Sequence, residues 1–153
     1  MLGQSDQQES EISDGKPSGS RVLVVDDCSD TAHVCARLLR LSGFDVAIAL
    51  SGFEALRLAT EFQPRIILLD IGLPDIDGFE VARRLRAAAK SKTMTLIAFT
   101  AFASETTRAR ANDGGFDHFL VKPIPFADLL TLLGELTATP VDRAQFPTSR
   151  PDD

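Results

Sequence analysis

Short apolar runs alternate with amphipathic stretches along the middle of the chain. Three of these runs, residues 22–25, 66–69 and 96–99, are unbroken. Continuous apolar runs of this length are typical of strands covered on both faces, as in the interior of a parallel sheet. Two runs that are shorter or mixed with polar residues, 45–49 and 118–121, favour strands at the sheet edges. The pattern therefore predicts five strands, three central and two peripheral.

The stretches between the strands have the periodicity and the start signals of helices. After Ser29, a candidate N-cap, the apolar residues Val34, Leu38 and Leu41 recur at the i, i+4, i+7 spacing of one helix face. The other start signals are capping-box spacings at residues 51–54 and 77–80, a weaker helix from Ser104, and Pro125 at a first helical position.

Strict alternation of strands and helices predicts an α/β fold with a parallel sheet, helices on both faces and right-handed crossovers. With the second and fifth strands at the edges, the expected order is 2-1-3-4-5, the doubly wound flavodoxin-like arrangement. We expect this domain to span residues 20–137. Residues 1–19 carry four acids, one lysine and almost no large apolar residue, so they predict a disordered tail or linker. Residues 138–153 are interpreted as a second tail.

The composition narrows the class of protein. The chain has 153 residues, of which 44% are hydrophobic and 25% charged, as in an ordinary globular domain. The net charge of −6 does not favour direct binding to nucleic acid. No apolar run approaches the ~20 residues that span a bilayer, and the first residues lack an export signal. Together with only two cysteines, these features predict a cytoplasmic protein without a membrane span.

Polar side chains follow the strands at the points where they end. Asp26 and Asp27 follow the first strand, Asp70 the third, Thr100 the fourth and Lys122 the fifth. In an open α/β sheet, ligands bind beyond the carboxyl ends of the strands, at the switch point of the strand order. We therefore expect three carboxylates, a hydroxyl and an ammonium group to meet in one crevice.

This set of groups suits phosphoryl transfer. Three adjacent carboxylates repel one another unless a cation lies between them, and Mg²⁺ prefers oxygen ligands of this kind. No histidine or thiol stands at the strand ends to favour zinc or copper. Asp70, at the end of a central strand, is the candidate nucleophile that becomes an aspartyl-phosphate. Lys122 and Thr100 can then bind phosphoryl oxygens.

Four segments carry a resemblance to a known family. They are residues 22–27, 67–78, 99–101 and 119–123. In this order and at these strand ends, they resemble the receiver domain of two-component response regulators, in a style closer to the receivers of hybrid kinases. The resemblance covers roughly residues 20–137. It implies that Asp70 takes a phosphoryl group from a phosphohistidine on a sensor histidine kinase or a histidine phosphotransfer protein.

The resemblance also assigns roles to other residues. Those implied in Mg²⁺ binding are Asp26, Asp27, Asp70 and, through its backbone carbonyl, Gly72. Thr100 and Phe119 would form the switch pair that responds to phosphorylation. Lys122 and Pro123 would be joined by a cis peptide bond. The surface built by the fourth helix, fifth strand and fifth helix would be remodelled by phosphorylation and is a candidate dimer face.

Two other functions are alternatives to a phospho-accepting receiver. A receiver-like interaction domain that no longer takes phosphate is expected to lack an acid or the lysine, and this chain lacks neither. An aspartate-nucleophile phosphatase resembling the haloacid dehalogenase group would carry Asp-x-Asp on its first strand. Here the nucleophile candidate is on the third strand and is followed two residues later by Gly72. The sequence therefore favours a receiver that accepts a phosphoryl group and does not favour an enzyme.

Four residues near the site have further expected roles. Asp77 is expected to cap the helix that follows it, and Asp75 is expected to be a solvated loop acid. Gly72 and Phe102, two residues after Asp70 and Thr100 respectively, are expected to border the path of an attacking water. Because neither side chain can orient that water, we predict slow self-dephosphorylation.

Overall fold

A computed structural model describes residues 20–88, 94–101 and 104–138. Its strands are β1 (Arg21–Val25), β2 (Asp45–Ala49), β3 (Ile66–Leu69), β4 (Thr95–Thr100) and β5 (His118–Val121). All pairings are parallel, and the order is β2-β1-β3-β4-β5. The predicted fold class and strand order are therefore confirmed.

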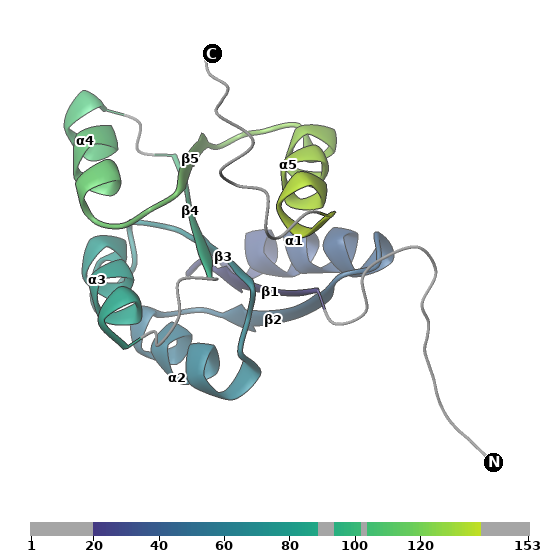
Figure 1. Cartoon of the computed structure of the whole chain (residues 1–153), viewed down its shortest axis with the longest axis horizontal. Coiled ribbons are helices and arrows are strands. Elements are labelled where there is room, and N and C mark those ends of the chain that lie inside the picture. Colours follow the sequence, from purple (N-terminus) through teal and green to yellow (C-terminus); the bar gives the residue numbers. More distant parts are fainter. Residues whose placement is uncertain (1–19, 89–93, 102–103, 139–153) are drawn as a thin grey trace.

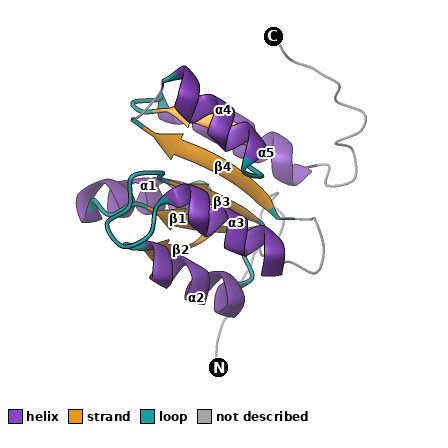
Figure 2. Cartoon of the chain, turned by 90° about the vertical axis from the view of Figure 1, so that its left-hand side faces the viewer, coloured by secondary structure: helices purple, strands orange, loops and turns teal. Residues whose placement is uncertain are grey.

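The helices form a layer on each face of the sheet. They are α1 (Ser29–Leu41), α2 (Gly52–Phe62), α3 (Gly78–Ala88), α4 (Glu105–Asp113) and α5 (Phe126–Ala138). Helices α1 and α5 cover one face, and α2, α3 and α4 cover the other (Figures 1 and 2). Within the described ranges, no helix is long and apolar enough to cross a membrane.

Burial along the strands follows their place in the sheet. Every residue of β3, in the middle of the sheet, is buried, whereas the residues of β5 at one edge are all partly exposed. Alternate strand side chains enter two separate cores, because successive residues point to opposite faces. Leu23 and Ile67 lie in the core under α2, α3 and α4, and Val24 and Leu68 in the core under α1 and α5.

Two expectations about α1 were wrong. Cys28, not Ser29, is at the N-cap position, and its side chain makes no capping hydrogen bond. The face marked by the spacing of Val34, Leu38 and Leu41 is turned to solvent, with Val34 59% and Leu41 76% exposed. The buried face instead carries small residues and one leucine, namely Ala32, Ala36 and Leu39.

The caps predicted for α2 and α3 are confirmed. The Ser51 hydroxyl accepts the Glu54 N–H at 3.2 Å, and the Glu54 carboxylate accepts the Leu50 N–H at 2.8 Å. At α3, the Asp77 carboxylate accepts the Glu80 N–H at 2.9 Å. The bonds made by the Glu54 and Glu80 N–H groups satisfy donors that a helix start leaves without an intrahelical partner.

Most of the two predicted tails, residues 1–19 and 139–153, lies outside the described residues. The division of the chain into a domain at residues 20–137 and two tails stays a prediction.

At the amino ends of the strands, the Arg86 side chain of α3 bonds to residues just before β4 and β5. Its guanidinium donates to the Gly115 carbonyl at 2.9 Å and 2.7 Å, to the Met94 carbonyl at 2.8 Å and to the Asp117 carboxylate at 2.6 Å. The same Asp117 oxygen accepts the Leu96 N–H at 2.9 Å. One side chain of α3 therefore satisfies acceptors in the two segments that precede β4 and β5.

Replacing Arg86 with Met is expected to lower the free energy of unfolding by about 1.5–3 kcal/mol, because partly buried acceptors lose a charged donor. Urea denaturation measures this change. Arg83→Met is the matched control, since the Arg83 side chain is 67% exposed and pairs only on the surface with Glu80. Its expected change is within about 0.5 kcal/mol. Equal losses in both variants would contradict a special role for Arg86.

Candidate functional site

Three carboxylates converge at the carboxyl ends of β1 and β3. Asp26, Asp27 and Asp70 each offer an oxygen, and these oxygens lie within 4.8 Å of one another. The backbone holds the acids in register with neighbouring strands, because the Asp26 N–H donates to the Ala49 carbonyl at 3.1 Å and the Asp70 N–H to the Val25 carbonyl at 3.0 Å. Asp26 is buried, Asp70 is half-buried and Asp27 is exposed. The three acids of the predicted site are therefore brought together.

Lys122 enters the same crevice from the end of β5. Its ammonium group donates to the Asp26 carboxylate and, at 3.3 Å, to the Asp70 carboxylate. Burial by itself would lower the pKa of Lys122, but the hydrogen bond to Asp26 and the charge of Asp70 outweigh burial and raise that pKa above its ordinary value. The amine is therefore charged at neutral pH. The peptide bond between Lys122 and Pro123 is cis, as expected.

The second oxygens of the two inner acids are also bonded. The Cys28 N–H donates to Asp26 Oδ1 at 2.9 Å, and the Gly72 N–H donates to Asp70 Oδ1 at 3.1 Å. Each carboxylate is thus oriented by the backbone turn that follows it. The described cluster consists of carboxylates alone, without histidine or thiolate. The oxygens of these three carboxylates form a donor set that fits a hard divalent cation.

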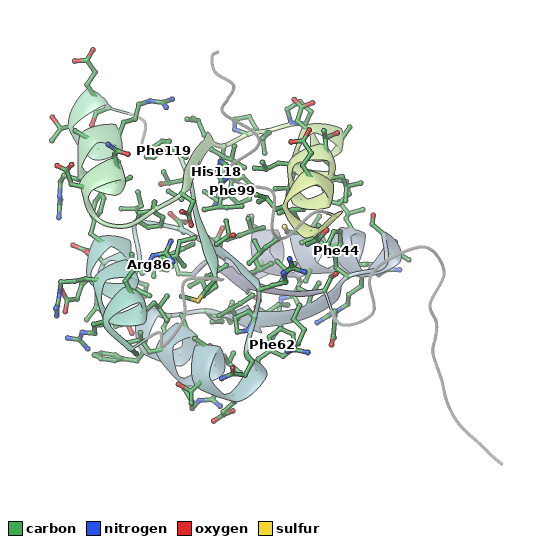
Figure 3. All side chains as sticks on the ribbon, viewed as in Figure 1. Phe44, Phe62, Arg86, Phe99, His118 and Phe119 are labelled. Carbon is green, nitrogen blue, oxygen red and sulfur yellow. The ribbon has the colours of Figure 1, made fainter. Side chains whose placement is uncertain are left out.

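Thr100 and Phe119 lie on neighbouring strands at the same end of the sheet. Thr100 is fully buried at the end of β4, and the Lys122 N–H donates to its carbonyl at 2.9 Å. Phe119 lies on the side of β5 that faces α4, partly buried against the core (Figure 3). The Arg108 guanidinium of α4 lies 4.7 Å from the centre of the Phe119 ring. A movement of this ring would therefore change its contact with α4.

Asp75 is an exposed loop acid, as expected, but it also makes a contact that was not expected. Although exposed, its carboxylate accepts the N–H groups of Gly52 and Phe53, each at 2.8 Å. Slight desolvation works against the shift, but the hydrogen bonds from Phe53 and Gly52 lower the pKa of Asp75 from 3.8 to about 2. Sequence reasoning missed this role because the partners lie more than twenty residues upstream, and no local spacing signals such a contact.

One predicted site residue lies outside the described part of the chain. The placement of Phe102, expected to border the path of a hydrolytic water, is not described. Slow self-dephosphorylation therefore stays a prediction.

Comparison with known families agrees with this geometry. The family profile described as "Response regulator receiver domain" matches residues 22–134. This chain belongs to that family. Its acidic pocket of Asp26, Asp27 and Asp70 is typical of phospho-accepting response regulators. Members are receivers for signals rather than enzymes, and the family implies a histidine kinase as a partner.

Individual receiver proteins resemble the chain over most of its length. The transcriptional regulatory protein PrrA of Mycobacterium leprae is 44% identical over 113 residues, which cover 74% of this chain and 48% of PrrA. A CheY-like receiver domain protein from Methanospirillum hungatei has a TM-score of 0.75 at 28% identity, covering 80% of this chain and 97% of that one. The BeF3-activated receiver domain of Klebsiella pneumoniae RstA has a TM-score of 0.70 at 26% identity, covering 76% and 97%. The chain thus spans about half the length of the curated relative.

Proposed function

We propose that this receiver takes a phosphoryl group onto Asp70 from a phosphohistidine of a sensor histidine kinase or a histidine phosphotransfer protein, with Mg²⁺ bound at the acidic cluster. In this step a carboxylate oxygen of Asp70 bonds to phosphorus, the bond between phosphorus and the imidazole nitrogen breaks, and the imidazole keeps the electron pair. The convergence of three carboxylates and Lys122 in one crevice carries the proposal.

Burial and hydrogen bonding favour Asp70 over the other two acids as the acceptor. Asp26 and Asp70 are each bonded at both oxygens, but the Asp26 side chain is only 5% exposed and makes the closer contact with Lys122. Asp27 is exposed at the rim of the crevice. Asp70 lies between these extremes, with its side chain 12% exposed and its contact to Lys122 a long one. It is therefore both reachable by a phosphoryl donor and flanked by positive charge.

The other residues of the crevice would orient and neutralise the phosphoryl group. The oxygens proposed to hold Mg²⁺ are those of Asp26, Asp27 and Asp70 and the backbone carbonyl of Gly72. Bound Mg²⁺ supplies positive charge to the phosphoryl oxygens. Lys122 would exchange its contact with Asp70 for a phosphoryl oxygen, and the Thr100 hydroxyl would donate to another.

Phosphorylation would then act on the surface of α4, β5 and α5. We propose that Thr100 moves toward the phosphoryl group and that the Phe119 ring turns inward, shifting the population between two existing states. The contact between Phe119 and Arg108 supports a path from β5 to α4. Dimerisation through this surface, the absence of direct nucleic-acid binding and a cytoplasmic location stay predictions. The hybrid-kinase type gains no support, because the curated relative reported above is a transcriptional regulatory protein.

Intact-mass measurement tests the proposed function. The full chain is incubated with phosphoramidate, whose N–P bond mimics that of phosphohistidine, in buffer with Mg²⁺ or with excess chelator. We expect the mass of the chain to rise by one phosphoryl group with Mg²⁺. In chelator the phosphorylated fraction should fall at least about tenfold, because the phosphoryl oxygens then lack the positive charge of the ion.

Hydroxylamine provides a chemical control, since it cleaves an acyl phosphate and leaves phosphoserine or phosphothreonine intact. Equal incorporation with and without Mg²⁺ would contradict the metal assignment. Absence of any adduct under both conditions would favour a receiver-like interaction domain that no longer takes phosphate.

A further inference from the structure

The segment between β3 and α3, residues 70–77, is closely packed at its α3 end. It carries two of the proposed site groups, the carboxylate of Asp70 and the backbone carbonyl of Gly72. The Gly78 N–H donates to the Ile71 carbonyl at 2.8 Å. A Cβ atom on Gly78 would lie 2.7 Å from the Asp70 carbonyl oxygen, so the start of α3 touches the backbone of the acceptor residue itself.

The same segment is tied on its other side to α2. Both carboxylate oxygens of Asp75 are used, one by the Gly52 N–H and one by the Phe53 N–H, each at 2.8 Å. These are the first two residues of α2, whose N–H groups have no partner within the helix. A carboxylate is also favoured at this end of a helix by the helix dipole. Asp75 therefore bonds at two points to a helix that lies more than twenty residues earlier in the chain.

Close packing at Gly52 supports this contact independently. A Cβ atom on Gly52 would lie 2.5 Å from the Ile76 side chain and 3.0 Å from the Ile76 carbonyl oxygen. Only a glycine lets the start of α2 approach the segment this closely. The hydrogen bonds of Asp75 and the small size of Gly52 thus specify the same approach from opposite sides.

Helix α2 has a local cap of its own. The Ser51 hydroxyl already accepts the Glu54 N–H at 3.2 Å. Asp77, two residues after Asp75, makes the ordinary local contact by capping α3. Asp75 and Asp77 therefore differ, because Asp77 caps the helix it begins whereas Asp75 bonds to a different helix.

We propose that Asp75 is a positioning residue for the metal site: by bonding to the start of α2, it sets the place of the Gly72 carbonyl relative to the acids Asp26, Asp27 and Asp70. This inference rests on the proposed function. Only two residues separate Gly72 from Asp75, so releasing Asp75 frees the peptide next to the acids. Mg²⁺ requires near-ideal octahedral geometry with oxygens at about 2.0–2.1 Å, so a misplaced carbonyl weakens its binding.

Isothermal titration of Mg²⁺ into the unphosphorylated full chain tests the proposal. We expect Asp75→Ala to raise the Mg²⁺ dissociation constant about three- to tenfold, less than the ~10–100-fold typical of groups bonded directly to a metal ligand. Asp75→Asn keeps one oxygen acceptor and should lie between Asp75→Ala and the wild type. Gly52→Ala, which leaves Asp75 in place but pushes α2 away from Ile76, should also weaken Mg²⁺ binding.

Asp77→Ala is the matched control, because it removes the same side chain from the same segment but only a local cap. It should lower the melting temperature about as much as Asp75→Ala while changing the Mg²⁺ dissociation constant less than about twofold. Equal weakening in both variants, or unchanged Mg²⁺ affinity in Asp75→Ala despite a lower melting temperature, would show that Asp75 is a helix cap only. A wild type that binds Mg²⁺ but takes up no phosphoryl group would overturn the proposed function alone.

Discussion

Asp70→Asn is expected to take up no phosphoryl group from phosphoramidate in Mg²⁺, whereas the wild type takes up one. The amide has nearly the shape of the carboxylate, so the crevice keeps its packing. Its nitrogen is not a nucleophile toward phosphorus, and its oxygen no longer carries the negative charge that attacks. The bond between Lys122 and Asp26 stays in place, so the loss measures the nucleophile rather than the fold. Intact mass after a fixed incubation is the measurement.

The matched control for this change is Asp77→Asn, the same replacement in the segment that follows Asp70. Because Asp77 bonds to the start of α3, that variant should be phosphorylated like the wild type. If Asp70→Asn were fully phosphorylated and Asp27→Asn were not, the acceptor would instead be Asp27, the exposed acid. Peptide mapping of the adduct decides between the two.

Leu39→Ala is expected to lower the free energy of unfolding by about 2–5 kcal/mol. Leu39 is fully buried in the core between α1, α5 and the sheet. Removing its outer atoms loses their transfer free energy and leaves a cavity, since the neighbouring side chains close it only in part. Urea denaturation followed by far-ultraviolet circular dichroism measures the change without a tryptophan or tyrosine, neither of which the chain contains.

Leu41→Ala provides the comparison on the same helix. Leu41 is 76% exposed, so the same truncation should change stability by less than about 0.5 kcal/mol. The two variants together report which face of α1 is turned to the core. A larger loss in Leu41→Ala than in Leu39→Ala would contradict the orientation of α1 described above.

The strands and the acidic crevice could be predicted from the sequence because their signals are local. Unbroken apolar runs identify strands buried on both faces, and β2, β3 and β5 have the predicted bounds. Their alternation with helices restricts the topology to a few right-handed arrangements. In a parallel sheet all carboxyl ends lie at one edge, so acids at strand ends must approach one another. The sequence alone therefore predicted that the side chains of Asp26, Asp27 and Asp70 lie together.

Which face of α1 is buried, and what Asp75 contacts, were decided only by the tertiary structure. Periodicity marks an apolar stripe, but how closely α1 approaches the sheet determines which residues fit, and here Ala32 and Ala36 allow a close approach. The partners of Asp75 belong to another helix, so their contact depends on how α2 and the segment after Asp70 pack together. A sequence pattern describes neighbours along the chain, whereas these contacts arise only when distant segments fold against the same sheet.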